Sequence, residues 1–153
     1  MKLAEALTIR ADLQKRLEQL KARMLRNAKV QDGDTPAEEP QTLLAEYESG
    51  ASELVELIVR INLTNASATV LGMPMTAALA ERDMLKQRQA VYRDLAQAAT
   101  ITQAVSTRSE IRFRSTVSVA MLQQEADKLA KKLRELDARI QEQNWMIELL
   151  EAH

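Results

Sequence analysis

The sequence contains no cysteine, one histidine, three glycines and three prolines among its 153 residues, and aromatic residues make up only 3% of it. Without cysteine the chain can form no disulfide, no thiolate metal site and no cysteine nucleophile. The one histidine, His153, stands at the last position, so we expect no histidine-based triad and no histidine-rich metal site. So few glycines and prolines do not suit a fold with many turns.

The residues that are abundant favour helices. Hydrophobic residues make up 46% of the chain and charged residues 28%, and the hydrophobic ones are mostly Leu, Ala, Ile, Val and Met, which are typical of helix-to-helix packing. A chain of 153 residues has the usual size of one domain, so we expect a single domain over residues 1–153. No run approaches the roughly 18 apolar residues of a membrane span, and residues 1–16 lack the features of a signal peptide. The sequence therefore predicts a soluble, cytoplasmic protein.

Charge is distributed unevenly along the first half of the chain. Residues 1–30 carry eight basic and three acidic side chains, a net charge of +5, whereas residues 31–66 carry eight acidic and one basic, a net charge of −7. A basic segment can be an arm that binds nucleic acid. Two adjacent segments of opposite charge can instead attract each other, and we favour this second interpretation because the basic segment is itself amphipathic. Nucleic acid is thus not among the expected partners.

Four segments have the apolar spacing of three and four residues that marks a packed helix. They cover residues 2–29, 40–65, 77–100 and 119 to about 151, with Thr76 and Ser118 as candidate N-caps. The apolar seam of the second segment is Leu44, Tyr47, Ala51, Leu54, Ile58 and Ile61. Gly50 lies inside this segment and predicts either a close helix crossing or a kink.

The predicted fold class is all-α: an antiparallel bundle of four long helices with coiled-coil-like seams and two short β-like links. The last helix would be roughly 45–50 Å long, which is more than a compact domain of this size needs. The surplus length favours packing against a second copy, so we expect a homo-oligomer.

The two β-like links lie at residues 68–75 and 106–117. The first contains Leu71-Gly72 and Pro74, and we expect a small hairpin or an extended connection there. The second alternates apolar and polar residues, as a strand does. Its polar residues are candidates for an edge that pairs with a second copy: Arg108, Glu110, Arg112 and Arg114. Contact with nucleic acid through these arginines and Phe113 is the alternative.

An up-down-up-down bundle would gather several polar residues at one end. These candidate ligand or interface residues are Arg10, Arg60, Asn62, Asn65, Arg82, Asp83, Asn144 and Trp145. Arginine and amide groups can bind a carboxylate or phosphate beside an apolar wall. The alternative is structural: the asparagines cap helix ends, Arg60 pairs with Asp83, and Trp145 anchors a core or dimer seam. No residue is assigned a catalytic role, and no cofactor or metal is expected.

Several of these segments together resemble one family of small bacterial helical proteins, labelled septicolysin-like. The segments are MKLAEALTIRADLQKRLEQL at the start, RINLTN at 60–65, LAERD at 79–83, RSEI at 108–111 and RIQEQNW at 139–145. The resemblance spans nearly the whole chain and implies no catalytic residues, while the family label implies a cytolysin. The chain departs from the pattern at Leu71-Gly72, where Asp-Gly would be more usual, and this disfavours a tight type I′ turn.

Three functions are consistent with the sequence. The first is a non-enzymatic protein of the interaction or scaffold type that associates with itself. The second is a small-ligand-binding protein, or an enzyme of unknown class, that uses the polar cluster. The third is membrane lysis, as the family label implies. Because the chain has neither a membrane span nor an amphipathic hairpin long enough to cross roughly 30 Å, a membrane is not among the expected partners.

Overall fold

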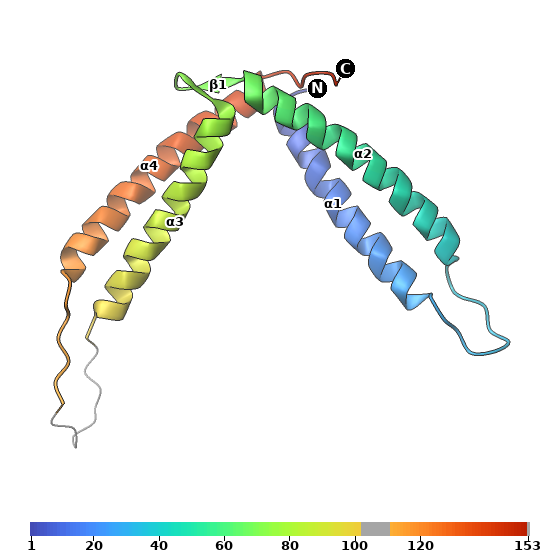
Figure 1. Ribbon diagram of the computed structural model, residues 1–153, viewed down its shortest axis with the longest axis horizontal. Coiled ribbons are helices and arrows are strands. Elements are labelled where there is room, and N and C mark those ends of the chain that lie inside the picture. The colour runs from blue at the N-terminus through green and yellow to red at the C-terminus, as the bar shows by residue number, and fades with distance from the viewer. Residues whose placement is uncertain (102–110, 153) are drawn as a thin grey trace. The chain divides into compact units, whose positions relative to one another are not determined.

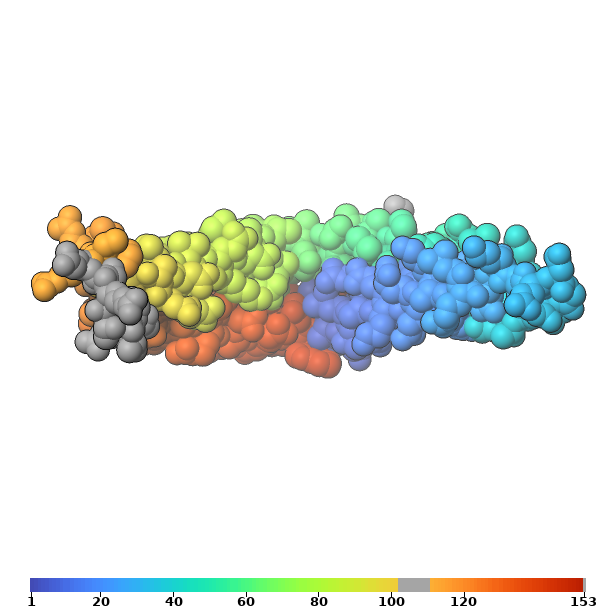
Figure 2. All heavy atoms as spheres, turned by 90° about the horizontal axis from the view of Figure 1, so that it is seen from below, coloured from blue at the N-terminus to red at the C-terminus, as the bar shows by residue number. Residues whose placement is uncertain are grey.

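The computed structural model describes residues 1–101 and 111–152. These residues form four helices, α1 (Leu3–Arg26), α2 (Pro40–Ser67), α3 (Met75–Ala99) and α4 (Val119–Met146), and two short strands, β1 (Thr69–Val70) and β2 (Met73–Pro74). The predicted all-α class and its four long helices are confirmed. The helices pack in antiparallel pairs, α1 with α2 and α3 with α4 (Figure 1, Figure 2).

The chain divides into two compact units, and α4 contributes to both. The first unit comprises Met1–Thr69 and Gln141–His153, and the second comprises Val70–Ile140. The predicted single domain is not tested by this division and stays a prediction.

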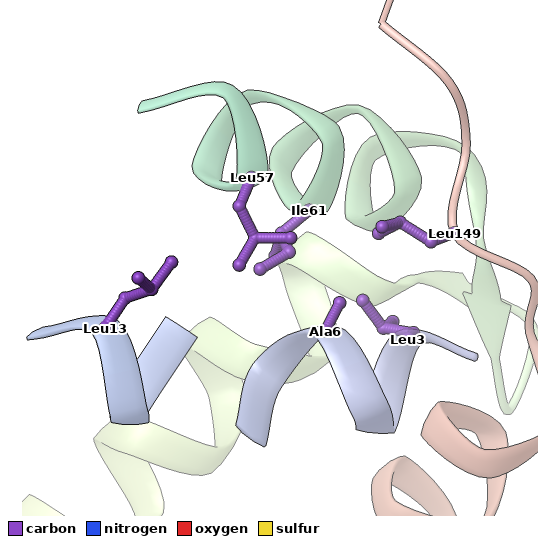
Figure 3. Close-up of a cluster of buried hydrophobic side chains, with 6 residues drawn as sticks. All are labelled: Leu3, Ala6, Leu13, Leu57, Ile61 and Leu149. Atoms are coloured by element: carbon purple, nitrogen blue, oxygen red, sulfur yellow. The ribbon is translucent and has the colours of Figure 1, made fainter. Parts of the chain in front are cut away.

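The core of the first unit lies along the seam between α1 and α2. One cluster contains Leu3, Ala6 and Leu13 of α1 with Leu57 and Ile61 of α2, and Leu149 from the C-terminal segment completes it (Figure 3). A second cluster contains Leu17, Leu20 and Leu43. Each fully buried leucine or isoleucine stabilises the pair by about 1.5–3 kcal/mol relative to exposure. The buried residues of α1 thus follow the spacing of three and four residues that predicts a helix over residues 2–29.

The predicted seam of α2 is confirmed at Tyr47, Ala51, Leu54 and Ile61, which pack in the core clusters, and is wrong by one residue at Leu44 and Ile58. Leu43 and Leu57 are buried, whereas Leu44 is 41% exposed and Ile58 is only partly buried. Leucine or isoleucine stands at adjacent positions, 43–44 and 57–58, so both registers satisfy the apolar spacing. Packing against α1 selects the register that brings Gly50 close to it.

Gly50 is a point of close approach between the two helices. A Cβ atom built on Gly50 would lie 3.0 Å from Cδ2 of Leu17. The expected close crossing is thus present, and the absence of a side chain at Gly50 makes room for Leu17.

The turn between β1 and β2 corrects a second expectation. The small hairpin is present, and both central residues of its turn have positive φ, +51° for Leu71 and +79° for Gly72. Positive φ at both positions is the mark of a type I′ turn, so the turn forms despite leucine at a position that favours Asn, Asp or Gly. Leu71 consequently holds a left-handed backbone conformation that is strained for a leucine.

The second unit contains the pair α3 and α4. Its buried side chains include Leu85 and Ala96 of α3 and Leu129, Leu136 and Ile140 of α4. Helix α3 begins at Met75 after Pro74, so Thr76 lies in the first turn and is not the N-cap. Ser118 does cap α4, because its Oγ accepts a hydrogen bond from the Met121 N–H at 3.3 Å.

The predicted strand at 106–117 is wrong over the part that the structure describes. Residues 111–117 have no strand structure, and residues 106–110 lie outside the described residues. Ile111 and Phe113 are 72% and 80% exposed, so the alternating pattern has no sheet face to bury against.

The predicted end of the last helix is also wrong. Helix α4 ends at Met146, and the following residues run antiparallel to the N-terminus, with a bridge between Lys2 and Glu148. The Leu3 N–H donates to the Ile147 carbonyl, and the Leu149 N–H donates to the Met1 carbonyl, both at 2.9 Å. The first N–H groups of a helix have no partner within it, so the C-terminal segment satisfies a donor of α1.

We expect Gly50→Val to destabilise the first unit by about 1–2 kcal/mol. Valine has a better helix propensity than glycine, but its Cβ would meet Leu17 at 3.0 Å, and overpacking costs about 1–3 kcal/mol. Thermal unfolding followed by circular dichroism measures the change, with the exposed Ala45→Val of the same helix as the control. An unfolding temperature equal to or above that of the unmodified chain would contradict the close crossing.

Candidate functional site

The outward surface of α2 is apolar although α1 covers only the opposite side. Val55, Val59 and Leu63 follow one another at intervals of four residues and are 63%, 43% and 46% exposed. We call these three residues the outer face of α2. The core residues Leu57 and Ile61 of the same stretch point toward α1 (Figure 3). Between positions 54 and 63 the helix is therefore apolar on two sides, which is unusual for a helix with one packing partner.

The surroundings of this face are acidic. Glu48 and Glu56 lie on the same side of α2 as the outer face and are exposed. An apolar row bordered by carboxylates can bind a partner surface that combines an apolar side chain with basic groups.

Sequence reasoning did not identify the outer face of α2. The sequence prediction places the apolar seam of this helix at six residues from Leu44 to Ile61 and assigns no role to Val55, Val59 and Leu63. The available signal was the run LVELIVRINL at 54–63, in which seven of ten residues are apolar. Such a run predicts a helix covered on more than one side.

Arg60, a candidate of the polar cluster, is bound to the C-terminal segment. Its Nε donates to the Leu150 carbonyl at 3.0 Å, and its Nη2 lies 2.9 Å from Oε1 of Glu151. The structural alternative included a pairing of Arg60 with Asp83, whereas the ion pairs within the units join Arg60 to Glu151 and Arg82 to Asp83. The guanidinium of Arg60 therefore has a structural role at the end of α2.

Thr64, one turn after Arg60, has a similar role. Its hydroxyl donates to the Arg60 carbonyl at 2.7 Å and accepts from the Leu150 N–H at 2.9 Å. The side chain is only 1% exposed. The polar residues that follow the apolar run of α2 are thus partly explained by this attachment of the chain end.

Arg82 and Asp83 of the predicted cluster lie in the second unit. Nη1 of Arg82 is 3.3 Å from Oδ1 of Asp137 on α4, which braces α3 against α4. Nε of Arg82 is buried without a hydrogen-bond partner, and the nearest carboxylate oxygen, Oδ1 of Asp83, is 3.6 Å away. This arginine therefore links α3 to α4 through Asp137, while its Nε has no hydrogen-bond partner.

The remaining members of the predicted cluster lie in the first unit. Arg10 and Asn65 are half-buried, Asn62 is exposed, Asn144 is 5% exposed, and Trp145 is 61% exposed. A common ligand site built from both units stays a prediction.

The predicted edge of arginines is only partly described. Arg112 and Arg114 are exposed and do not belong to a strand. Arg108 and Glu110 lie outside the described residues. Pairing of this segment as a strand edge therefore stays a prediction.

The Glu148 carboxylate, beside the N-terminus in the first unit, pairs with two cations. The Glu148 carboxylate lies 3.2 Å from the N-terminal ammonium and 2.6 Å from the Lys2 ammonium. Hydrogen bonds from these two cations hold the pKa of Glu148 below its usual value. At the far end of the same unit, hydrogen bonds from Arg23 likewise lower the pKa of Glu38. Both pairs fasten chain segments that follow or precede a helix.

Two kinds of site are absent from the described part of the chain. No group of three His, Asp or Glu side chains is placed to hold a metal ion within residues 1–101 and 111–152. None of the helices described there is both long and apolar enough to cross a membrane.

Comparison with known proteins identifies the family. Residues 10–149 match the model described as "Family of unknown function (DUF6847)". The chain belongs to this family. The chain is also similar to a solved structure described as "Crystal structure of a functionally unknown conserved protein from Corynebacterium diphtheriae". The two sequences are 40% identical, and the structures have a TM-score of 0.92 over 98% of this chain and 99% of that chain. No curated protein matches.

The family assignment corrects the resemblance inferred from the sequence. The matching model is DUF6847, and the comparisons give no septicolysin-like family. The recurring polar segments on which the resemblance was based include residues with structural roles, such as Arg60 and Arg82. The implied cytolysin activity has no remaining support.

We expect Glu148→Gln to lower the unfolding temperature by a small amount at neutral pH. The folded-state pKa of Glu148 lies below its ordinary value of 4.5, so its stabilisation is complete above that pH and is lost as the pH falls through the folded pKa. The glutamine variant cannot titrate at this position. The difference between the two proteins should therefore shrink below about pH 4.5.

Differential scanning fluorimetry across pH 3–8 measures this difference, with Glu18→Gln on α1 as an exposed control. A difference that is constant over the whole range would show that the ion pairs of Glu148 do not cause it.

Proposed function

We propose that the protein is a self-associating interaction protein, and that the outer face of α2 is the surface through which it binds. The observation that carries this proposal is the row Val55, Val59 and Leu63, exposed on a helix whose other side is already buried against α1. Single exposed hydrophobic residues are normal, whereas a contiguous row marks a surface that binds.

The row has the dimensions of a helix-packing seam. At 1.5 Å per residue it extends over about 12 Å, which is two helical turns. Valine and leucine at intervals of four residues form the ridge that packs into the groove of a neighbouring helix. A second helix laid on this ridge would complete the burial that α1 provides on the other side.

The energetics support reversible binding. Burying the exposed part of three such side chains contributes about 2–4 kcal/mol, and flanking contacts must supply the rest of what is needed to overcome the cost of association. We therefore expect an association in the micromolar range, which depends on concentration and does not require an obligate oligomer.

Val59→Glu should abolish self-association. The carboxylate would be placed in the middle of an apolar contact, where an unpaired charge costs more than the lost methyl groups. Because Val59 is 43% exposed, the fold should tolerate the change, and helicity by circular dichroism should be unchanged. Light scattering after size exclusion at tens of micromolar should then give the 17.2 kDa chain mass for the variant and a larger mass for the unmodified protein.

The matched control is Val91→Glu, the same substitution at a valine of α3 that is 63% exposed. It should leave the association intact. If the unmodified protein has the mass of one chain at all concentrations tested, the proposal is wrong.

A further inference from the structure

The two units carry opposite net charges. The second unit, Val70–Ile140, contains twelve basic and eight acidic residues, a net charge of +4. The first unit contains nine basic and fourteen acidic residues, a net charge of −5. A chain with this asymmetry attracts a second copy when the first unit of one copy meets the second unit of the other.

Leu71 combines a largely exposed apolar side chain with a backbone conformation that is unfavourable for leucine. It is 65% exposed and has a φ of +51°, a conformation that glycine, asparagine or aspartate adopts at lower cost. A strained residue persists where something other than folding stability requires it. The turn itself does not require leucine, so we look for a role of the exposed Leu71 side chain.

Leu71 lies in a basic surface groove of the second unit. The groove has a volume of about 610 Å³, and Lys132, Arg134 and Arg139 of α4 line it together with a single acidic residue, Glu135. We call this the Leu71 groove. It combines an apolar side chain with a net positive charge, which is complementary to the apolar, acidic outer face of α2.

We infer that the Leu71 groove of one copy receives the outer face of α2 of a second copy. This inference rests on the proposed function and names the surface that the outer face binds. Leu71 packs among Val55, Val59 and Leu63, and the basic groups of α4 lie beside Glu48 and Glu56. The two surfaces differ, so the contact is head-to-tail, and each copy has one face and one groove to offer.

A symmetric contact between two outer faces fits the charges less well. Glu48 and Glu56 of both copies would then border the same interface, and like charges at an interface lower affinity. The head-to-tail contact replaces this repulsion with attraction that salt should weaken.

The deciding experiment mixes two variants, each with one surface disabled. Val59→Glu removes the outer face and keeps the groove. The double variant Lys132→Glu/Arg134→Glu reverses the charge of the groove and keeps the face. Each alone should have the mass of one chain at a concentration where the unmodified protein associates, with a dissociation constant raised about 10-fold or more.

Mixed in equal amounts, the two variants should form a complex of two chains and nothing larger, since only one functional face and one functional groove remain. Light scattering detects the complex. The control for charge is Lys128→Glu/Lys131→Glu, the same change on α4 outside the groove, which should associate like the unmodified protein.

Leu71→Asn gives a second, independent measurement. Asparagine suits the left-handed conformation, so the unfolding temperature should rise by about 2–4 °C. The dissociation constant should rise about 10-fold because the apolar contact is lost. A Leu71→Asn variant that is more stable but associates more weakly would show that Leu71 acts in binding, because damage to the fold would lower the stability as well.

The possible failures are distinguishable. If the unmodified protein does not associate, the proposed function is wrong and this inference with it. If Val59→Glu abolishes association while the groove variants associate normally, the proposed function is supported and the Leu71 groove is not the receiving surface. If both variants are monomeric but do not combine when mixed, the contact is not head-to-tail and the inference is overturned.

Discussion

A helix in a two-helix pair has only one side covered, and this constraint governs what the first unit can do. Helix α1 suits this arrangement, because its apolar residues form one stripe that α2 covers and its other sides are charged. Helix α2 does not, since Leu57 and Ile61 face α1 while Val55, Val59 and Leu63 remain exposed on another side. The surplus apolar surface stabilises nothing within the pair. It is a cost to solubility unless another surface covers it at least part of the time, and that is the physical basis for treating it as a binding surface.

The polar residues that draw attention in the sequence have a different explanation. Arg60 and Thr64 fix the C-terminal segment to the end of α2, and the backbone of that segment pairs with Met1 and Leu3. The Thr64 hydroxyl uses its one donor and one of its two lone pairs within the chain, and its side chain is buried, so it is not presented to a ligand in solvent. Arginine and hydroxyl side chains occur both in binding sites and at chain ends that are fixed by hydrogen bonds. The two roles are distinguished by what these side chains bind, which here is the C-terminal segment.

The sequence predicts the helices, their antiparallel packing and most of their buried residues, and it fails at particular positions for identifiable reasons. Helix α1 has one apolar stripe, so its seam is unambiguous. Helix α2 has leucine or isoleucine at adjacent positions 43–44 and 57–58, so two registers fit, and the choice depends on the space that Gly50 leaves for Leu17. The residues after Met146 keep the helical spacing, yet they leave the helix because α1 offers unpaired backbone groups far away in sequence. The candidate site was missed for the same reason: the local pattern shows that residues 54–63 of α2 are apolar on more than one side, but packing against α1 decides which side stays exposed.

The turn at Leu71 and the charge of the two units argue for the same direction of assembly. A leucine held at positive φ with most of its side chain in solvent is less favourable for folding than the asparagine or glycine that the turn prefers, and this cost supports the proposed contact with a second copy. Lys132 and Arg134 beside it make that contact favourable for an acidic partner surface, and the first unit supplies one with a net charge of −5. A head-to-tail contact of this kind either closes into a ring or continues into a chain of copies. If the proposed contact forms, each interface would bury little apolar area, so growth beyond small assemblies would require a higher concentration and copies would exchange readily.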